Sequence, residues 1–196
     1  MLYNMSGAQS GNARKIVRKR TKGTGIYMRN VITRRIRLPF TAVGNNIREN
    51  IQFELKREFE GKCVKEGYIK EGSVRTVGHS AGVVDSRYVL FDVVFECLVC
   101  HPVEGMNIRC VVKNVTKAGI RAETKEEKSP VVIFIARDHH HRSQAFSSLE
   151  VGGDITVKVI GIRYELNDEY ISIIAELVER KRKIQKKKSK ITIEET

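Results

Sequence analysis

A pair of cysteines, Cys97 and Cys100, forms a C-x-x-C motif inside the hydrophobic run from Tyr88 to Cys100. In a strand, residues three apart point to opposite faces of the sheet. A structural zinc site also needs a second ligand pair at similarly close spacing, which Cys63 and Cys110 do not supply. We therefore expect four buried cysteines in a reducing setting, and no metal.

A second run of candidate ligands reads Asp138-His139-His140-His141-Arg142. Three adjacent histidines rarely converge on one ion without a helical or strand spacing, and nothing nearby completes a coordination shell. A solvated loop is favoured, with imidazoles able to stack on bases or to titrate near neutral pH. The sequence holds no P-loop, G-x-S-x-G, H-E-x-x-H or dinucleotide fingerprint, so neither an enzyme nor a cofactor is expected.

The net charge of +13 is concentrated at the two ends of the 196-residue chain. Residues 1–37 carry ten Lys/Arg and no acid, and residues 179–196 carry eight Lys/Arg against three Glu, which leaves residues 38–178 slightly acidic. This pattern indicates a near-neutral folded body with cationic arms that seek phosphate or acidic protein surface. No apolar run approaches the roughly 20 residues of a membrane helix, and a secretory leader is not expected.

One helix and a set of strands are predicted for the first half of the chain. Residues 1–30 have few apolar side chains and are expected to be a disordered basic extension. Val31–Phe40 alternates and predicts a strand, and Asn46 with Glu49 predicts a capping box. The apolar stripe of the helix that follows is Ile47, Ile51, Leu55 and Phe59. Gly61 is the expected helix stop, and further strands are predicted at 67–69, 73–77, 82–84 and 88–100.

Five further strands are predicted after Gly105, within about 75 residues: 106–115, 118–123, 131–136, 154–164 and 169–177. A short helix is expected over 142–149. Five strands with this spacing are typical of an OB-fold, although small barrels without nucleic-acid function share the pattern.

The order of several short motifs resembles the seventh-subunit, or stalk, family of archaeal and eukaryotic multisubunit RNA polymerases. The resemblance runs from about Ile36 to Val178. The motifs that carry it are Leu38-Pro39 with Gly44, Glu60-Gly61-Lys62-Cys63 with Gly67-Tyr68-Ile69, Gly82-Val83-Val84, Val89–Pro102, Pro102-Val103-Glu104-Gly105, Val115-Thr116-Lys117-Ala118-Gly119-Ile120, and Val159-Ile160-Gly161-Ile162-Arg163 with Asn167-Asp168.

This resemblance implies an α+β, mostly β chain with a truncated RNP-like domain over 31–104 and a five-stranded OB barrel of the ribosomal-protein-S-one type over 105–179. Residues 180–196 form a basic tail. The implied role is that of a non-catalytic polymerase subunit that contacts nascent RNA. Its implied partners are the polymerase core, at the largest subunit and the clamp base, and a helical partner like the fourth subunit. No membrane partner is implied.

Two sets of site residues are expected. The core-docking tip loop is Glu60, Gly61, Lys62, Cys63, Gly67 and Tyr68. RNA binding by a barrel needs aromatic faces and cations, and the candidates are Lys113, Lys117, Arg121, Phe134, Arg137, His139, His140, Arg142, Arg163, Tyr164 and Tyr170.

The chain departs from the family in its basic extensions and in a short segment between the third and fourth barrel strands, which points to a divergent version, such as one from a large DNA virus. The expected location is the nucleus, or a viral factory or virion. A free-standing RNA-binding OB protein is the alternative.

Overall fold

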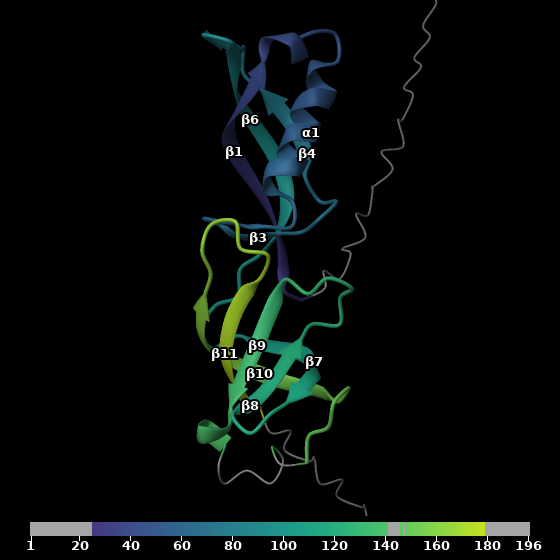
Figure 1. The fold of residues 1–196 in the computed structure, drawn as a ribbon, viewed down its shortest axis with the longest axis vertical. Helices are drawn as coiled ribbons and strands as arrows, with labels where there is room; N and C mark the ends of the chain where they lie inside the picture. The colour runs from purple at the N-terminus through teal and green to yellow at the C-terminus, as the bar shows by residue number, and fades with distance from the viewer. Residues whose placement is uncertain (1–24, 141–145, 147, 179–196) are drawn as a thin grey trace, which may run out of the picture.

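The computed structural model describes residues 25–140, 146 and 148–178. Two β units lie end to end along the long axis of the molecule (Figure 1). We call the sheet and helix between residues 27 and 100 the first module, and the strands between residues 107 and 177 the barrel. The predicted tail at 180–196 and most of the predicted extension and of the predicted helix at 142–149 lie outside the described residues.

The first module is built on one long central strand, β6 (Tyr88–Cys100). β1 (Tyr27–Pro39) pairs antiparallel with β6 along its whole length, from Tyr27 opposite Cys100 to Pro39 opposite Tyr88. Three shorter strands pair with the other side of β6: β3 (Gly67–Ile69), β4 (Arg75–His79) and β5 (Val83–Asp85). A further short strand, β2 (Cys63–Val64), pairs with β3.

β1 begins at Tyr27, whereas the alternation in the sequence predicted a start at Val31 and placed residues 27–30 in a disordered extension. That expectation is wrong for these residues. The physical reason is that β6 provides backbone partners for β1 as far as Cys100. The Tyr27 side chain also packs against the core of the barrel.

The helix α1 (Ile47–Phe59) covers one face of this sheet. Ile51, Leu55 and Phe59 are buried as predicted, and the Phe59 ring stacks on Phe95 of β6 with centroids 5.7 Å apart. The helix ends before Gly61, whose φ of +73° is readily adopted only by glycine. Asn46 precedes the helix but makes no side-chain cap hydrogen bond, so the predicted capping box is wrong.

The barrel is closed by five strands in the order β10-β11-β9-β8-β7. Their bounds are β7 Asn107–Val115, β8 Gly119–Glu123, β9 Val131–Ala136, β10 Asp154–Arg163 and β11 Ile171–Leu177. All five predicted strands are confirmed, and the closed barrel is consistent with an OB-fold. The RNP-like character of the first module stays a prediction.

β6 serves both hydrophobic cores of the molecule. Cys97 is buried with α1 in the core of the first module, whereas Cys100 is buried in the core of the barrel. The two cysteines therefore point into different cores, as the strand alternation predicted. Two short 3-10 turns complete the described elements, η1 (Phe40–Ala42) after β1 and η2 (Arg137–His140) after β9.

Candidate functional site

The predicted tip loop, Glu60–Tyr68, does not protrude. It forms the β2–β3 hairpin, which lies where the first module meets the barrel. The Cys63 N–H donates to the Asp168 carbonyl (2.8 Å), and the Asn167 N–H donates to the Cys63 carbonyl (2.9 Å). Cys63 and Tyr68 are 1% and 2% exposed and belong to the barrel's core. The hairpin therefore joins the modules, with Lys65 exposed, and its predicted role in core docking stays a prediction.

Gly67 shows why the loop needs glycine. Its φ is +127°, and a Cβ at this position would lie well inside contact distance of the Cys100 carbonyl oxygen. The hairpin therefore lies flat against the end of β6. Glycine at this position therefore permits close backbone packing.

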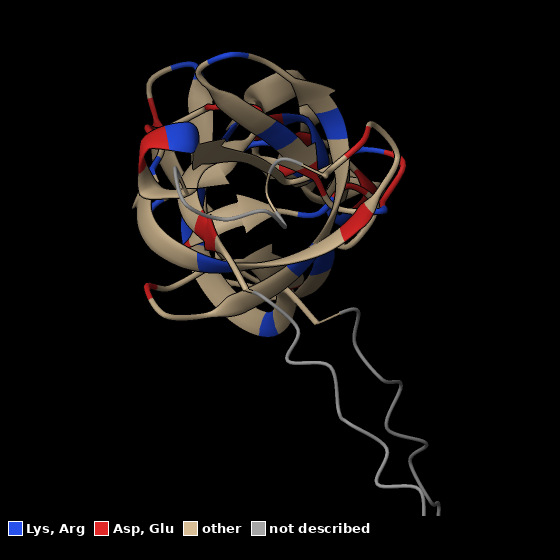
Figure 2. Ribbon diagram, turned by 90° about the horizontal axis from the view of Figure 1, so that it is seen from below, with Lys and Arg blue, Asp and Glu red and all other residues tan. Residues whose placement is uncertain are grey.

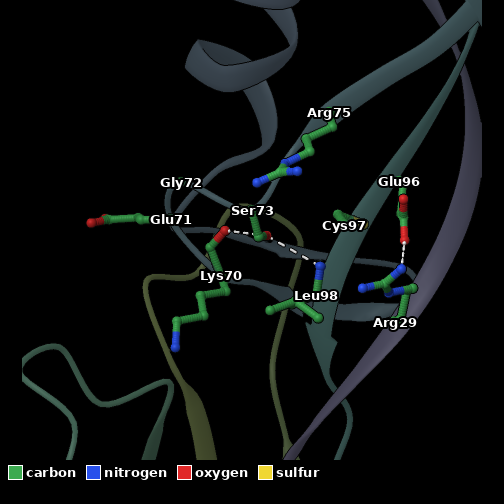
Figure 3. Close-up of a pocket in the computed structure, with 9 residues that line it drawn as sticks. All are labelled: Arg29, Lys70, Glu71, Gly72, Ser73, Arg75, Glu96, Cys97 and Leu98. Atoms are coloured by element: carbon green, nitrogen blue, oxygen red, sulfur yellow. Dashed lines mark hydrogen bonds and ion pairs between the residues drawn. The ribbon is translucent and has the colours of Figure 1, made fainter. Parts of the chain in front are cut away.

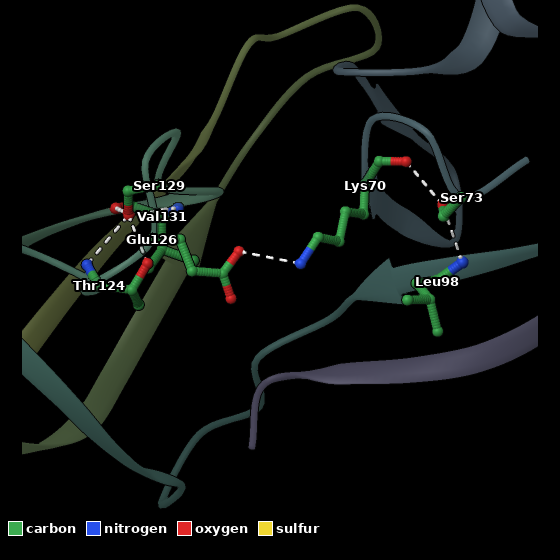
Figure 4. A network of polar contacts seen from close by, with 7 residues as sticks. All are labelled: Lys70, Ser73, Leu98, Thr124, Glu126, Ser129 and Val131. Carbon is green, nitrogen blue, oxygen red and sulfur yellow. Dashed lines mark hydrogen bonds and ion pairs between the residues drawn. The ribbon is translucent and has the colours of Figure 1, made fainter. Parts of the chain in front are cut away.

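Ion pairs and hydrogen bonds tie the turn after β3 to the β8–β9 loop (Figure 4). The Lys70 Nζ lies 3.4 Å from a Glu126 carboxylate oxygen, and Lys128 pairs with Glu71. On the first-module side, the Ser73 hydroxyl donates to the Lys70 carbonyl (2.6 Å) and accepts from the Leu98 N–H (3.1 Å). We call these contacts, together with the β2–β3 hairpin, the joint.

The cysteines and Tyr27 at the joint are largely shielded from water. Burial raises the pKa of the Cys63 and Cys100 thiols to about 12, with nearby carboxylates adding to the effect. Burial and Glu126 also raise the pKa of Tyr27 well above its usual range. These groups stay neutral near pH 7, so the two cysteines are packed thiols with little nucleophilic character. Within the described residues, no three His, Cys, Asp or Glu side chains gather as a metal site requires.

The opposite end of the first module exposes apolar side chains that the sequence did not single out as a site. Phe40, Val83 and Val84 are 59%, 64% and 64% exposed. They lie at the same end of the module, because the Phe40 N–H donates to the Arg87 carbonyl (3.1 Å), in the turn that follows β5. We call these three residues the distal end, and the β5–β6 hairpin that carries two of them lies at the upper end of Figure 1. The Gly82-Val83-Val84 motif was visible in the sequence, but its exposure was not.

Several predicted RNA-binding residues do meet on the barrel. Arg121 of β8 lies directly opposite Phe134 of β9, and Phe134 lies opposite Ile174 of β11. Phe134 and Ile174 are 40% and 51% exposed, so an aromatic and an aliphatic side chain share the outer surface with a cation. Arg137 directly follows β9, and its guanidinium donates to the Thr116 carbonyl (3.2 Å). Arg137 therefore lies beside the β7–β8 turn. We call the surface made by Lys113, Lys117, Arg121, Phe134 and Arg137 the barrel face.

Gly119 lets the Phe134 ring lie close to β8. A Cβ at Gly119 would come within 2.9 Å of the Phe134 ring and still closer to the Ile135 carbonyl oxygen. The glycine in the Thr116-Lys117-Ala118-Gly119 turn is therefore a packing requirement of the barrel face, and it was among the motifs that carried the resemblance.

The other predicted RNA-binding residues lie elsewhere. His140 is structural: its Nε2 accepts from the Leu177 N–H (2.8 Å), so Nδ1 carries the proton and donates to the Ala136 carbonyl (3.0 Å). Its ring also stacks on Phe146, which contradicts the expected solvated histidine. Tyr164 donates to the Lys65 carbonyl (3.3 Å) and belongs to the joint. His139, Arg163 and Tyr170 are exposed, and Arg142 lies outside the described residues.

The charges on the barrel are mixed. Seen from below in Figure 2, basic and acidic segments alternate around it. Residues 105–178 contain ten Lys/Arg and ten Asp/Glu. No field of a single sign therefore covers the described part of the barrel. Among the described residues, no helix has the length and hydropathy needed to cross a membrane.

Comparison with known proteins gives consistent relatives. The chain is 27% identical over 160 residues to a protein of Acanthamoeba polyphaga mimivirus provisionally named a DNA-directed RNA polymerase subunit, covering 72% of this chain and 76% of that protein. It is 23% identical over 169 residues to DNA-directed RNA polymerase II subunit 7 of Arabidopsis thaliana, and 22% identical to subunit RPB7 of the same polymerase in Glycine max. Both plant comparisons cover 74% of this chain and 94% of the relative.

No protein-family model matches the chain. The resemblance predicted from the sequence motifs is confirmed: the chain is similar to the seventh subunit of RNA polymerase II and to a polymerase subunit of a large DNA virus.

Proposed function

We propose that the protein is a non-catalytic stalk subunit of a DNA-dependent RNA polymerase. The observation that carries the proposal is coverage: the similarity extends over 94% of the Arabidopsis subunit, so it concerns a whole subunit and not one shared domain. A barrel alone would not support this, since small barrels host many unrelated functions.

The distal end is the surface we propose for docking on the polymerase core. Exposed apolar side chains that lie together at the end of an elongated molecule are typical of a protein interface. Phe40, Val83 and Val84 are exposed at this end, whereas Cys63 and Tyr68 of the β2–β3 hairpin predicted for this role are buried in the joint. Docking through the distal end would hold the barrel away from the core.

The barrel face is the surface we propose for contact with nascent RNA. Phe134 offers a ring for stacking, and Lys113, Lys117 and Arg121 offer cations for phosphate. The mixed charge of the barrel implies weak contact that does not depend on sequence, and the contact should weaken as salt rises because phosphate binding releases counterions. A helical partner like the fourth subunit and a nuclear or viral-factory location complete the proposal.

Comparison of two matched variants tests the docking surface. Val84→Asp places a charge on the distal end, and Val151→Asp places one at a similarly exposed valine on a loop of the barrel. Both tagged chains are expressed in the cells from which the protein comes, and the co-purified polymerase subunits are quantified by mass spectrometry. We expect Val84→Asp to lose the large subunits and Val151→Asp to keep them. Equal recovery with both variants would refute docking through the distal end.

A further inference from the structure

A pocket of about 290 Å³ lies on the first module beside the joint (Figure 3). Arg29 of β1, Lys70 of the turn after β3 and Arg75 of β4 line it, together with the acids Glu71 and Glu96. It opens on the face of the sheet opposite α1, since Glu96 and Leu98 alternate with Phe95 and Cys97, which are buried toward the helix. None of its lining residues belongs to the distal end or to the barrel face.

Among the three cations that line the pocket, Arg75 is the one without a side-chain partner in the described part of the chain. Its side chain is exposed, and among the described residues it makes no hydrogen bond or ion pair. In Figure 3 its guanidinium is turned toward the Gly72–Ser73 turn. The residue directly across the ladder is Glu96, but the Glu96 carboxylate is engaged by Arg29 at 2.8 Å. Glu96 therefore pairs with Arg29, and Arg75 has no carboxylate partner among the described residues.

The remaining charges of the pocket are also weighted toward cations. Glu71 is paired with Lys128, and Lys70 reaches Glu126 only at 3.4 Å, near the outer limit of a hydrogen bond. The Arg29–Glu96 pair is mostly exposed on the arginine side, and exposed pairs of this kind contribute little stability. An arriving anion can thus recruit Arg29 and Lys70 at little cost, while Arg75 is already available.

Guanidinium groups present parallel N–H donors that match the oxygens of a phosphate. The position of the pocket favours a nucleic-acid phosphate. Lys70 stacks over Tyr27, the first residue of β1, with Nζ 4.6 Å from the ring centroid. The segment before it, residues 1–24, contains six Lys/Arg and no acid. A polyanionic strand held at the pocket would therefore lie next to the root of a basic arm.

We infer that the pocket formed by Arg29, Lys70 and Arg75 binds a backbone phosphate of single-stranded RNA, at a site separate from the barrel face. The inference rests on the proposed contact with RNA. It extends the RNA path from the barrel across the joint to the first module. A phosphorylated or acidic protein is the competing occupant and is distinguished below.

RNA binding by the full-length chain tests the inference through its salt dependence. The probe is a uridine oligonucleotide of about 16 nucleotides, near the upper site size of one OB-fold. Arg75→Gln should weaken binding severalfold and lower the slope of log K against log salt by about 0.7, the value for one phosphate contact on a single strand. The control is Arg48→Gln, an exposed arginine of α1 on the other face of the sheet, which should change neither quantity.

A third variant separates this inference from the proposed function. Phe134→Ala removes the ring of the barrel face and leaves the pocket intact. If Phe134→Ala weakens RNA binding and Arg75→Gln does not, the pocket is refuted and the barrel face stands. If wild type does not bind RNA, the proposed RNA contact fails, and the inference that depends on it fails as well.

Titration with inorganic phosphate tests anion binding at the pocket in the absence of RNA. In a nitrogen-15 NMR titration of the full chain, the inference predicts shifts at the Arg75 side-chain Nε–H and at the Gly72 and Ser73 amides. The Arg75→Gln variant should lose the amide shifts. Shifts with phosphate but none with RNA would overturn the assignment to RNA in favour of a phosphorylated protein. No shifts with either ligand would refute an anion site.

Discussion

Tyr68 contributes to both modules, and its replacement by alanine should destabilise both. The residue belongs to the sheet of the first module, opposite Cys100 of β6, yet it is 2% exposed and packed within the barrel's core. An aromatic side chain buries about 150–250 Å². At about 25 cal/mol per Å² this corresponds to roughly 4–6 kcal/mol as an upper bound. Measured aromatic-to-alanine changes in cores cost about 3–5 kcal/mol, and we expect Tyr68→Ala to fall in that range.

Hydrogen exchange measured by mass spectrometry over a urea series is the suitable assay, since the chain contains no tryptophan. Peptides from α1 report on the first module, and peptides from β9 and β11 report on the barrel. Tyr68→Ala should lower protection in both sets, whereas Tyr68→Phe, which keeps the ring, should stay within about 1.5 kcal/mol of wild type. Tyr88→Ala, at a tyrosine that is 37% exposed, is the control for losing a ring at the surface.

Two results would refute this reasoning. Loss of protection confined to α1 and its sheet would show that Tyr68 does not support the barrel. A cost below about 1 kcal/mol for Tyr68→Ala would show that the joint is not packed as a core, because core truncations of this size cost more. If Tyr68→Ala does not fold, Tyr68→Leu provides a milder truncation that must still affect both peptide sets.

Three further predictions concern the barrel and the buried thiols. Gly119→Ala should cost about 1–3 kcal/mol through overpacking against Phe134 and the β9 backbone, and equilibrium urea unfolding measures it. His140→Ala should cost about 1–3 kcal/mol because the Leu177 N–H loses its acceptor, and a variant as stable as wild type would contradict the structural role of this histidine. The four cysteines, with pKa values raised by burial to about 11 or 12 from 9.0, should resist a thiol reagent at pH 8 until the chain is unfolded. The pKa of each thiol is higher in the folded chain than in the unfolded chain. The contribution of the neutral buried thiols to stability is therefore complete below pH 9 and is lost as pH rises toward 12. A free energy of unfolding that increases over this range would contradict their burial.

Local patterns predicted most of the fold. The barrel strands were readable because each alternates between inward and outward residues and is bounded by turn residues such as Gly119 and Gly152-Gly153. The long strand from Tyr88 to Cys100 was predicted with the bounds that the structure shows. The early start of β1 was not predicted, because residues 27–30 are only weakly apolar and owe their strand to a partner that is distant in the chain.

The candidate site was less accessible to sequence reasoning. Glycine-marked loops such as Glu60–Tyr68 look alike whether they protrude or pack flat, and only the neighbouring backbone of Cys100 distinguishes the two cases. The role of His140 depends on the Leu177 N–H, a contact between residues far apart in the chain. Arg121 and Phe134, in contrast, were both predicted to bind RNA, and the barrel register brings them together.

The most direct test of a polymerase-subunit role is the stoichiometry of the purified complex. The tagged chain is isolated from its native cells at moderate salt, and its partners are quantified by mass spectrometry. The proposed function predicts the large polymerase subunits in near-equal amounts with the tagged chain, accompanied by a small helical protein. Recovery of RNA or ribosomal proteins without polymerase subunits would contradict it and favour a free-standing RNA-binding protein.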